Sequence, residues 1–275
     1  MTKLDWSETP KTDLIVDGAR LEYFCLGPTP DQAPTIVLLH EGLGCAALWR
    51  DFPRALAKAT GMGVFVYSRR GYGQSDPSVL PWPVDALTRH ALEVLPQVLD
   101  QIGFQRGILL GHSDGATIAA EYAGSIEDHR VRGLVLMAPH FFTEAMGLAE
   151  ISHAREVFDT SGLRERMGKY HRDPDNAFQG WNGMWLNPHF KDWNVADVID
   201  YLRVPVLAIQ GRDDQYGTLA QIEEIENRSY APLDIEILDD CKHAPFLEQP
   251  EKTLGAVAEF AARLQRIETE QVVLS

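Results

Sequence analysis

The 275-residue sequence has few cysteines and no long apolar run. Its three cysteines, Cys25, Cys45 and Cys241, cannot all pair and show no metal-ligand spacing, so we expect reduced thiols. The N-terminal segment MTKLDWSETPKTDL lacks the apolar stretch of a secretion signal, and no later run reaches the length of a membrane span. These absences predict a cytoplasmic protein that does not bind a membrane.

Basic residues are also scarce, with 25 Lys and Arg against 40 Asp and Glu and a net charge of -15. Nucleic acids and anionic membrane surfaces attract basic patches, so the charge argues against both as partners. No internal repeat or low-complexity tract is present. The length fits one α/β catalytic unit with a large core.

The most informative motif is GHSDG at residues 111–115. It follows an apolar run at 106–110 and leads into a helical pattern at 116–123, so Ser113 lies on a sharp turn between a buried strand and a helix. The flanking glycines suit a turn with strained dihedral angles, where a Cβ would clash with nearby backbone. The pattern is typical of a nucleophile elbow. An ordinary serine N-cap is the alternative.

A serine hydroxyl is a weak nucleophile unless a histidine accepts its proton and a carboxylate orients that histidine. The predicted strand 204–210 ends before Asp213 and Asp214, which places both carboxylates on one loop. The predicted strand 233–238 leads to His243, just before the terminal helix. The order Ser113, Asp214, His243 is the one used on a strand–elbow–helix scaffold.

Four stretches carry a resemblance to the α/β-hydrolase superfamily. They are HEGLG at 40–44 after a predicted strand at 35–39, SRRGYGQS at 68–75 after a predicted strand at 63–67, the elbow, and HAPFLEQP at 243–250. The resemblance covers nearly the whole chain. It implies an α/β fold with a mostly parallel eight-stranded sheet flanked by helices, a triad of Ser113, Asp214 and His243, and neither cofactor nor metal. The family's spacing favours Asp214 over Asp213, which stays open as a turn residue.

The same logic predicts an oxyanion hole built from main-chain N–H groups. One donor is the N–H of Asp114, which follows the nucleophile at a helix N-terminus. The resemblance implies Gly42 as the second donor, with Leu43 as the fallback. Glu41 departs from the family's usual His-Gly pattern. Its carboxylate either repels anionic substrates in the pocket or points away and bonds to a loop.

Asp114 is the residue most informative about the substrate, because in this fold its side chain commonly faces the pocket. A carboxylate there would attract a cationic group such as an α-ammonium. Alternatively, it caps the elbow helix or bonds to Arg69 or Arg70. His112 is predicted to pack behind the nucleophile or to support the site.

The rest of the chain alternates between strand and helix patterns, as a parallel sheet requires. We predict a hairpin of strands 14–16 and 21–26 around the turn at 17–18, helices at 49–60 and 87–102, and a strand at 131–137.

Residues 140–202 carry no strand pattern and resemble the helical cap that the family inserts after the sixth strand, with 1–139 and 203–275 as the core domain. Its large apolar residues are expected to form the cap's own core, with about a third reaching the substrate. They are Phe141, Phe142, Phe158, Phe178, Trp181, Met184, Trp185, Phe190 and Trp193. The pocket candidates among them are Phe141, Trp181 and Trp185.

We therefore predict a carboxylesterase-like serine hydrolase that cleaves an ester of a small or medium-sized apolar or aromatic acyl group. The alternative is cleavage of a carbon–carbon bond in a vinylogous diketone, or opening of an enol-lactone. Vinylogous diketone substrates are carboxylates that need an arginine, and Arg69 and Arg70 are the candidates, whereas Glu41 and Asp114 count against this chemistry.

Epoxide and haloalkane hydrolysis are disfavoured because they need an aspartate in place of Ser113. A ligand receptor on the same fold is the least favoured function. The predicted partner is a small-molecule substrate, and a homodimer is left open.

Overall fold

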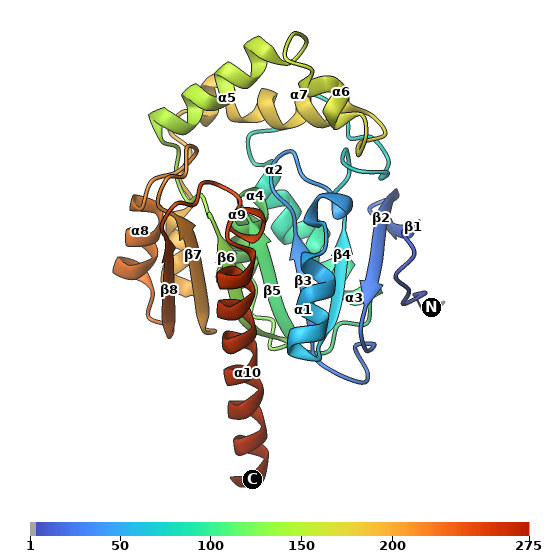
Figure 1. Ribbon diagram of the computed structural model, residues 1–275, viewed down its shortest axis with the longest axis vertical. Coiled ribbons are helices and arrows are strands. Elements are labelled where there is room, and N and C mark those ends of the chain that lie inside the picture. Colours follow the sequence, from blue (N-terminus) through green and yellow to red (C-terminus); the bar gives the residue numbers. More distant parts are fainter. Residues whose placement is uncertain (1–3, 275) are drawn as a thin grey trace.

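The computed structural model describes residues 4–274, apart from the side chains of residues 268 and 270–274. An eight-stranded sheet with the order β1-β2-β4-β3-β5-β6-β7-β8 forms its centre (Figure 1). The strands are β1 (Lys11–Val16), β2 (Ala19–Leu26), β3 (Thr35–Leu39), β4 (Gly63–Tyr67), β5 (Gly107–His112), β6 (Val131–Met137), β7 (Val206–Gly211) and β8 (Leu233–Leu238). Strand β2 pairs antiparallel with β1 and β4, and all other neighbours are parallel. The predicted fold is confirmed.

Helices flank both faces of this sheet and also cover the carboxyl ends of its parallel strands (Figure 1). They are α1 (Phe52–Thr60), α2 (Ala86–Arg89), α3 (Leu95–Gln101), α4 (Asp114–Ser125), α5 (Ala145–Val157), α6 (Leu163–Met167), α7 (Pro174–Trp185), α8 (Ala220–Arg228), α9 (Pro245–Glu248) and α10 (Pro250–Leu274). Shorter turns are η1 (Ala46–Trp49), η2 (His90–Val94), η3 (Pro188–Phe190) and η4 (Ala196–Tyr201).

Two predicted helices differ from the observed ones. The predicted helix at 49–60 begins only at Phe52, because Arg50 adopts a φ of 55° after η1 and interrupts the helical path. The predicted helix at 87–102 is present as α2, η2 and α3, with η2 forming one turn of π-helix between the other two.

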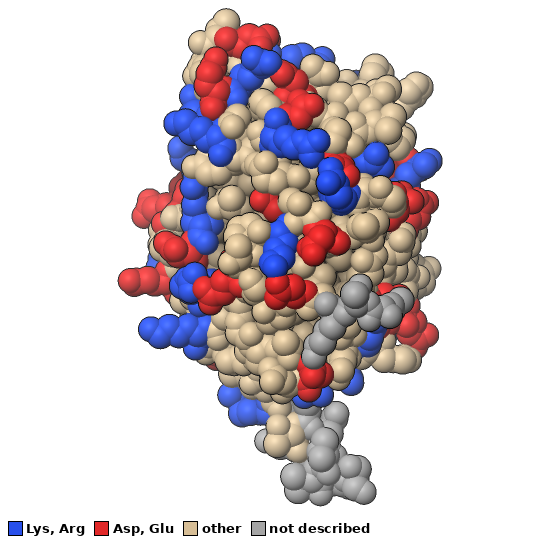
Figure 2. All heavy atoms as spheres, turned by 90° about the vertical axis from the view of Figure 1, so that its right-hand side faces the viewer, with Lys and Arg blue, Asp and Glu red and all other residues tan. Residues whose placement is uncertain are grey.

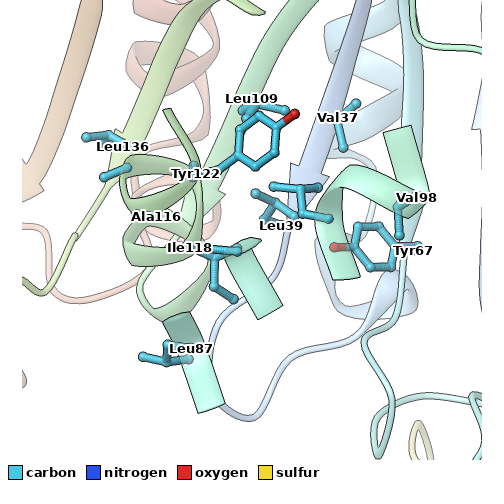
Figure 3. Close-up of a cluster of buried hydrophobic side chains, with 14 of the residues drawn as sticks. Val37, Leu39, Tyr67, Leu87, Val98, Leu109, Ala116, Ile118, Tyr122 and Leu136 are labelled. Atoms are coloured by element: carbon cyan, nitrogen blue, oxygen red, sulfur yellow. The ribbon is translucent and has the colours of Figure 1, made fainter. Parts of the chain in front are cut away.

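The strands β3 to β7 are mostly apolar because both faces of the sheet are buried there, whereas the edge strands β1 and β8 include charged residues and are only partly buried. In β3, Val37 and Leu39 belong to one core cluster, whereas Ile36 and Leu38 belong to the other. The first cluster packs against α2, α3 and α4, and the second against α1 and α10. Figure 3 shows the first cluster, in which Val37, Leu39, Leu109 and Leu136 of the strands lie beside Ala116, Ile118 and Tyr122 of α4.

The first two strands form the predicted hairpin, with longer arms than expected. Asp17 and Gly18 at its tip have φ values of 48° and 71°. A two-residue turn with positive φ at both positions matches the right-handed twist of the strands, and Asp-Gly is a favoured pair there.

The segment of α5, α6 and α7, here called the α5–α7 segment, connects β6 to β7 by way of η3 and η4. It lies across the carboxyl ends of the parallel strands (Figure 1). Two glycines mark close approaches between the segment and the sheet: a Cβ on Gly42 would lie 2.1 Å from Trp181 Nε1, and one on Gly147 would lie 2.2 Å from the carbonyl oxygen of Tyr216. The division into a core domain and a separate cap stays a prediction.

Charged side chains of both signs are interspersed on the face shown in Figure 2. Among the ion pairs of the described residues are those of Arg20 and Arg172 with Asp76. Within residues 4–274, no helix combines the length and the apolar character that crossing a membrane requires.

Candidate active site

Ser113 occupies the turn between β5 and α4 with φ 53° and ψ -120°. A Cβ on Gly111 would lie 2.2 Å from the carbonyl oxygen of Gly115, and one on Gly115 would lie 1.9 Å from the carbonyl oxygen of Leu39. Both glycines are therefore required by close backbone contacts. The Ser113 side chain makes no capping hydrogen bond to α4. Ser113 thus occupies the N-cap position of α4, but it is not the ordinary capping serine of the alternative, because its side chain does not cap the helix.

His243 and Asp214 meet at the carboxyl ends of the last two strands. The Nδ1 atom of His243 lies 2.8 Å from Oδ2 and 3.0 Å from Oδ1 of Asp214. Burial alone would raise the pKa of Asp214, but hydrogen bonds from His243 and from the N–H of Tyr216 outweigh it and lower that pKa. Asp214 is therefore ionised at neutral pH and orients the imidazole. Asp213 is exposed on the same loop and does not contact His243.

Ser113 and His243 line the same cavity, whose volume is about 90 Å³. Its floor consists of residues that follow the strand ends, among them Glu41, Gly42 and His140. Its roof comes from the α5–α7 segment, with Leu148 and Ile151 on α5 and Trp181 and Trp185 on α7. The cavity thus lies between the sheet and the segment that covers it.

Three main-chain N–H groups at this cavity are free to bind an oxyanion. Within residues 4–274, the N–H groups of Gly42, Leu43 and Asp114 donate no hydrogen bond. All three residues line the cavity together with Ser113. Their role as oxyanion donors stays a prediction, and the choice between Gly42 and Leu43 stays open.

The loop that carries these donors is held rigidly. The carbonyl oxygen of Glu41 accepts hydrogen bonds from His40 Nδ1 at 2.7 Å, from Arg69 Nη2 at 2.8 Å and from the N–H of Gly44 at 3.2 Å. His40 Nε2 in turn accepts from the N–H of Arg69 at 3.0 Å. Burial lowers the pKa of His40 well below its usual value, so this histidine is neutral and serves as both donor and acceptor.

Asp114 is fully buried at the edge of this cavity. Its Oδ1 accepts a hydrogen bond from Trp185 Nε1 at 3.2 Å, and its Oδ2 lies 3.8 Å from Arg69 Nη2. Burial raises the pKa of Asp114, and the nearby Arg69 charge opposes that rise. Of the alternatives for this side chain, the contact with Arg69 is the one observed. Arg70 instead donates to the carbonyl oxygen of Pro77.

Glu41 and His112 also meet beside Ser113 and His243. Glu41 lines the cavity, and its Oε2 lies 3.4 Å from His112 Nδ1. His112 Nε2 donates to the carbonyl oxygen of His243 at 2.6 Å. The Glu41 carboxylate thus lines the cavity and also contacts His112, and its repulsion of anionic substrates stays a prediction.

Phe141 is a correction to the predicted pocket. It is fully buried but does not line the cavity. Its N–H donates to Gln221 Oε1 and its carbonyl accepts from the N–H of Val195, so the backbone is fixed beneath the α5–α7 segment and the ring packs into the core. Of the nine large apolar residues expected here, only Trp181 and Trp185 line the cavity, fewer than the third that was expected.

His140, Tyr216 and Glu144 line the cavity without having been singled out in the sequence. The ring of His140 lies 5.6 Å from that of His243, and burial lowers its pKa to about 3, so it is neutral. The sequence holds a signal for His140, because it follows the end of β6 as Ser113 follows β5. Glu144 comes from outside any strand end, and its carboxylate accepts hydrogen bonds from Thr218 and Gln221.

No Lys or Arg is among the residues that line the cavity in the described part of the chain. Arg69 is 3% exposed and occupied by Glu41 and Asp114, while Arg70 lies outside the cavity. Nor does the described chain contain a group of three or more His, Cys, Asp or Glu side chains arranged to hold a metal ion.

Comparison with known proteins shows the family to which this chain belongs. The model of the α/β hydrolase fold matches residues 34–160. A hydrolase of 2-hydroxy-6-oxononadienedioate and 2-hydroxy-6-oxononatrienedioate from Pseudomonas putida is 36% identical, over 88% of this chain and 91% of that protein. The chain belongs to the α/β-hydrolase family. The mostly parallel eight-stranded sheet with flanking helices agrees with that family's fold.

Two solved structures show the same fold. The meta-cleavage product hydrolase from Pseudomonas fluorescens superposes on this α/β-hydrolase with a TM-score of 0.73 at 20% identity, covering 91% of this chain and 97% of that one. The enol-lactonase from Burkholderia xenovorans superposes with a TM-score of 0.70 at 21% identity, covering 90% and 98%. At this level of identity the two superpositions show the shared fold.

Proposed function

We propose that this α/β-hydrolase is a serine hydrolase that cleaves a small carboxylic ester through an acyl-enzyme. One observation carries the proposal. Ser113, on a strained turn, and His243, whose Nδ1 is bound to the ionised Asp214, face one small cavity with free main-chain donors. Such an arrangement suits attack of a hydroxyl on a carbonyl carbon.

In this mechanism His243 Nε2 accepts the Ser113 proton as the hydroxyl attacks the carbonyl. The negative oxygen that forms is stabilised by the N–H of Asp114 and by that of Gly42 or Leu43. Each such donor typically contributes 10²- to 10³-fold to the rate. His243 then gives its proton to the leaving alcohol and activates a water molecule that releases the acid. No step needs a cofactor.

The second candidate is hydrolysis of a carbon–carbon bond in a vinylogous diketone, or opening of an enol-lactone. It is favoured by the named activities of the relatives, which support it more directly than they support an esterase. The cavity wall speaks against a dicarboxylate substrate. No cationic side chain lines it, and Glu41, Asp114 and Glu144 all do.

The two candidates are separated by one substrate panel. Steady-state turnover is measured with p-nitrophenyl esters from acetyl to decanoyl, with a 2-hydroxy-6-oxo-dienoate, and with an enol-lactone. The proposal expects turnover of the short esters, because the cavity is small. Ser113→Ala should lower kcat by several orders of magnitude. Ser161→Ala, which alters an exposed serine, is the matched control.

Full activity in Ser113→Ala would contradict both candidates. Turnover of the dienoate or the lactone alone would replace the ester proposal with the second candidate. Ligand binding without turnover would point to a receptor. A cytoplasmic location, a small-molecule partner and an open question of dimerisation stay predictions from the sequence.

A further inference from the structure

The His112 ring lies between the carbonyl oxygen of His243 and the carboxylate of Glu41, two contacts that have no role in the proposed mechanism. The residue is 2% exposed, and its Nε2 lies 2.6 Å from the carbonyl oxygen of His243. A carbonyl oxygen can only accept a hydrogen bond, so Nε2 carries a hydrogen.

The second ring nitrogen, Nδ1, faces Oε2 of Glu41 at 3.4 Å. In a neutral imidazole with its hydrogen on Nε2, Nδ1 presents a lone pair. A lone pair and a carboxylate oxygen repel each other unless a proton lies between them. The contact therefore requires a proton on His112 Nδ1 or on Glu41.

This contact joins three parts of the site. Glu41 immediately precedes the candidate oxyanion donor Gly42, His112 immediately precedes Ser113, and the carbonyl that His112 binds belongs to His243 itself. The Glu41 carboxylate folds back beneath its own loop, where a Cβ on Gly44 would lie 2.3 Å from Oε2. Glycine at position 44 leaves room for this conformation.

We propose that the Glu41–His112 pair, holding one proton, positions the oxyanion loop and the His243 loop relative to Ser113, an inference that rests on the proposed serine hydrolase function. Neither residue exchanges a proton with the substrate in this scheme. Both act through the groups they hold, so they are positioning residues rather than catalytic ones.

The surrounding charges agree with a proton on His112. Burial would lower the pKa of His112, but the hydrogen bond and charge of Glu41 and the carbonyl of His243 outweigh it and raise that pKa. For Glu41, burial acts to raise the pKa, and the bond to His112 outweighs it and lowers that pKa. Both pKa shifts thus favour a proton on His112 and a negative charge on Glu41.

The other groups around the ring do not reverse this balance. Asp214 is ionised and favours a positive His112, and His140 is neutral. The ring of His243 lies 5.1 Å away, and Trp49 and Phe246 contact His112 with uncharged rings. Because the folded pKa of His112 is raised, the stabilisation from its proton is fully present below the ordinary pKa of histidine and is lost as the pH rises through the raised pKa.

The test compares the pH dependence of kcat in three proteins. In the native enzyme, kcat should fall at alkaline pH as the pair loses its proton and the two loops separate. In Glu41→Gln the amide donates to a neutral His112 Nδ1, so the alkaline decline should disappear. Glu144→Gln is the matched control, because it alters another cavity carboxylate that has no contact with His112, and it should retain the decline.

A further variant, Glu41→Ala, removes the contact with His112 altogether. It should lower kcat by roughly ten- to a hundredfold with little change in KM, because misplacement of reacting groups affects the chemical step. Glu41→Gln should lower kcat less. An alkaline decline that persists in Glu41→Gln, or a larger loss in Glu41→Gln than in Glu41→Ala, would overturn the proposal.

A second measurement does not depend on activity. NMR of protein labelled with ¹⁵N in the histidine rings should show His112 protonated at both nitrogens at pH 7, and Glu41→Gln should lose one of these protons. A singly protonated His112 in the native protein at pH 7 would overturn the inference. Failure of the serine hydrolase proposal would appear separately, as turnover that survives Ser113→Ala.

Discussion

The contact between Gly42 and Trp181 gives a sharp test of the oxyanion loop. In Gly42→Ala the new Cβ would lie 2.1 Å from Trp181 Nε1 and 2.3 Å from Trp181 Cδ1. Trp181 belongs to α7 and is only 6% exposed, so its indole has little room to move. The loop must therefore shift, and its free N–H groups move with it.

Two effects with different magnitudes are expected. Overpacking of this kind costs about 1–3 kcal/mol of folding stability. Displacement of one oxyanion donor should lower kcat by about 10²- to 10³-fold. The loss should appear in kcat more than in KM, because the donor acts mainly on the charge that develops during attack.

The assay combines ester kinetics with thermal unfolding. Gly183→Ala is the matched control, because Gly183 lies on the same helix as Trp181 and a Cβ there meets nothing within 4 Å. It should leave kcat unchanged and raise Tm slightly, since alanine favours a helix over glycine. In the double variant, Trp181→Ala should restore part of the kcat lost in Gly42→Ala by removing the clash.

A Gly42→Ala protein with native kcat would refute the reasoning about this loop. So would a loss of kcat that Trp181→Ala leaves untouched, because the steric cause would then be wrong. A drop in Tm without a drop in kcat would assign Gly42 to packing alone and move the second donor to Leu43.

Two further predictions concern buried carboxylates. Asp214→Asn should lower kcat by about 10⁴-fold with little change in KM, whereas Asp213→Asn, altered on the same loop without contact to His243, should be near native; equal effects in kinetic assays would contradict the assignment of the acid. Burial raises the pKa of Glu121 to about 7, and a hydrogen bond from Thr88 only partly offsets this rise. The cost of ionising Glu121 therefore lowers the folding stability only above the ordinary pKa of glutamate, and this cost grows as the pH rises toward 7. Glu121→Gln should therefore be more stable to urea than the native protein at pH 8, with a free energy of unfolding higher by up to about 3 kcal/mol, and the difference should be smaller at pH 5. A difference that does not change with pH would argue against a buried, titrating carboxyl group.

Much of the scaffold was readable in the sequence because it is specified locally. The apolar runs of the parallel strands, the Asp-Gly turn and the GHSDG elbow each encode a backbone geometry within a few residues. The helix boundaries were less accurate. Nothing in the residues 46–52 signalled that Arg50 would adopt a positive φ and delay α1 to Phe52.

The candidate site was predictable where residues follow strand ends. Parallel strands bring their carboxyl ends to one edge, so Ser113, Asp214 and His243 had to approach each other, although their catalytic roles stay predictions. The same rule applied to His140 would have found it. Phe141 was wrongly predicted to line the pocket, because an aromatic residue is as typical of a core as of a pocket.

The sequence by itself determined the sheet, the elbow and the order of the candidate catalytic residues, since each depends on short-range pattern and chain order. Only the tertiary structure decided that Asp114 faces Arg69, that Trp181 packs on Gly42, and that Glu41 reaches His112. These contacts join residues that lie about 40 to 140 positions apart in the sequence. Their partners depend on how side chains fill the space between the sheet and the α5–α7 segment, and no local pattern encodes that space.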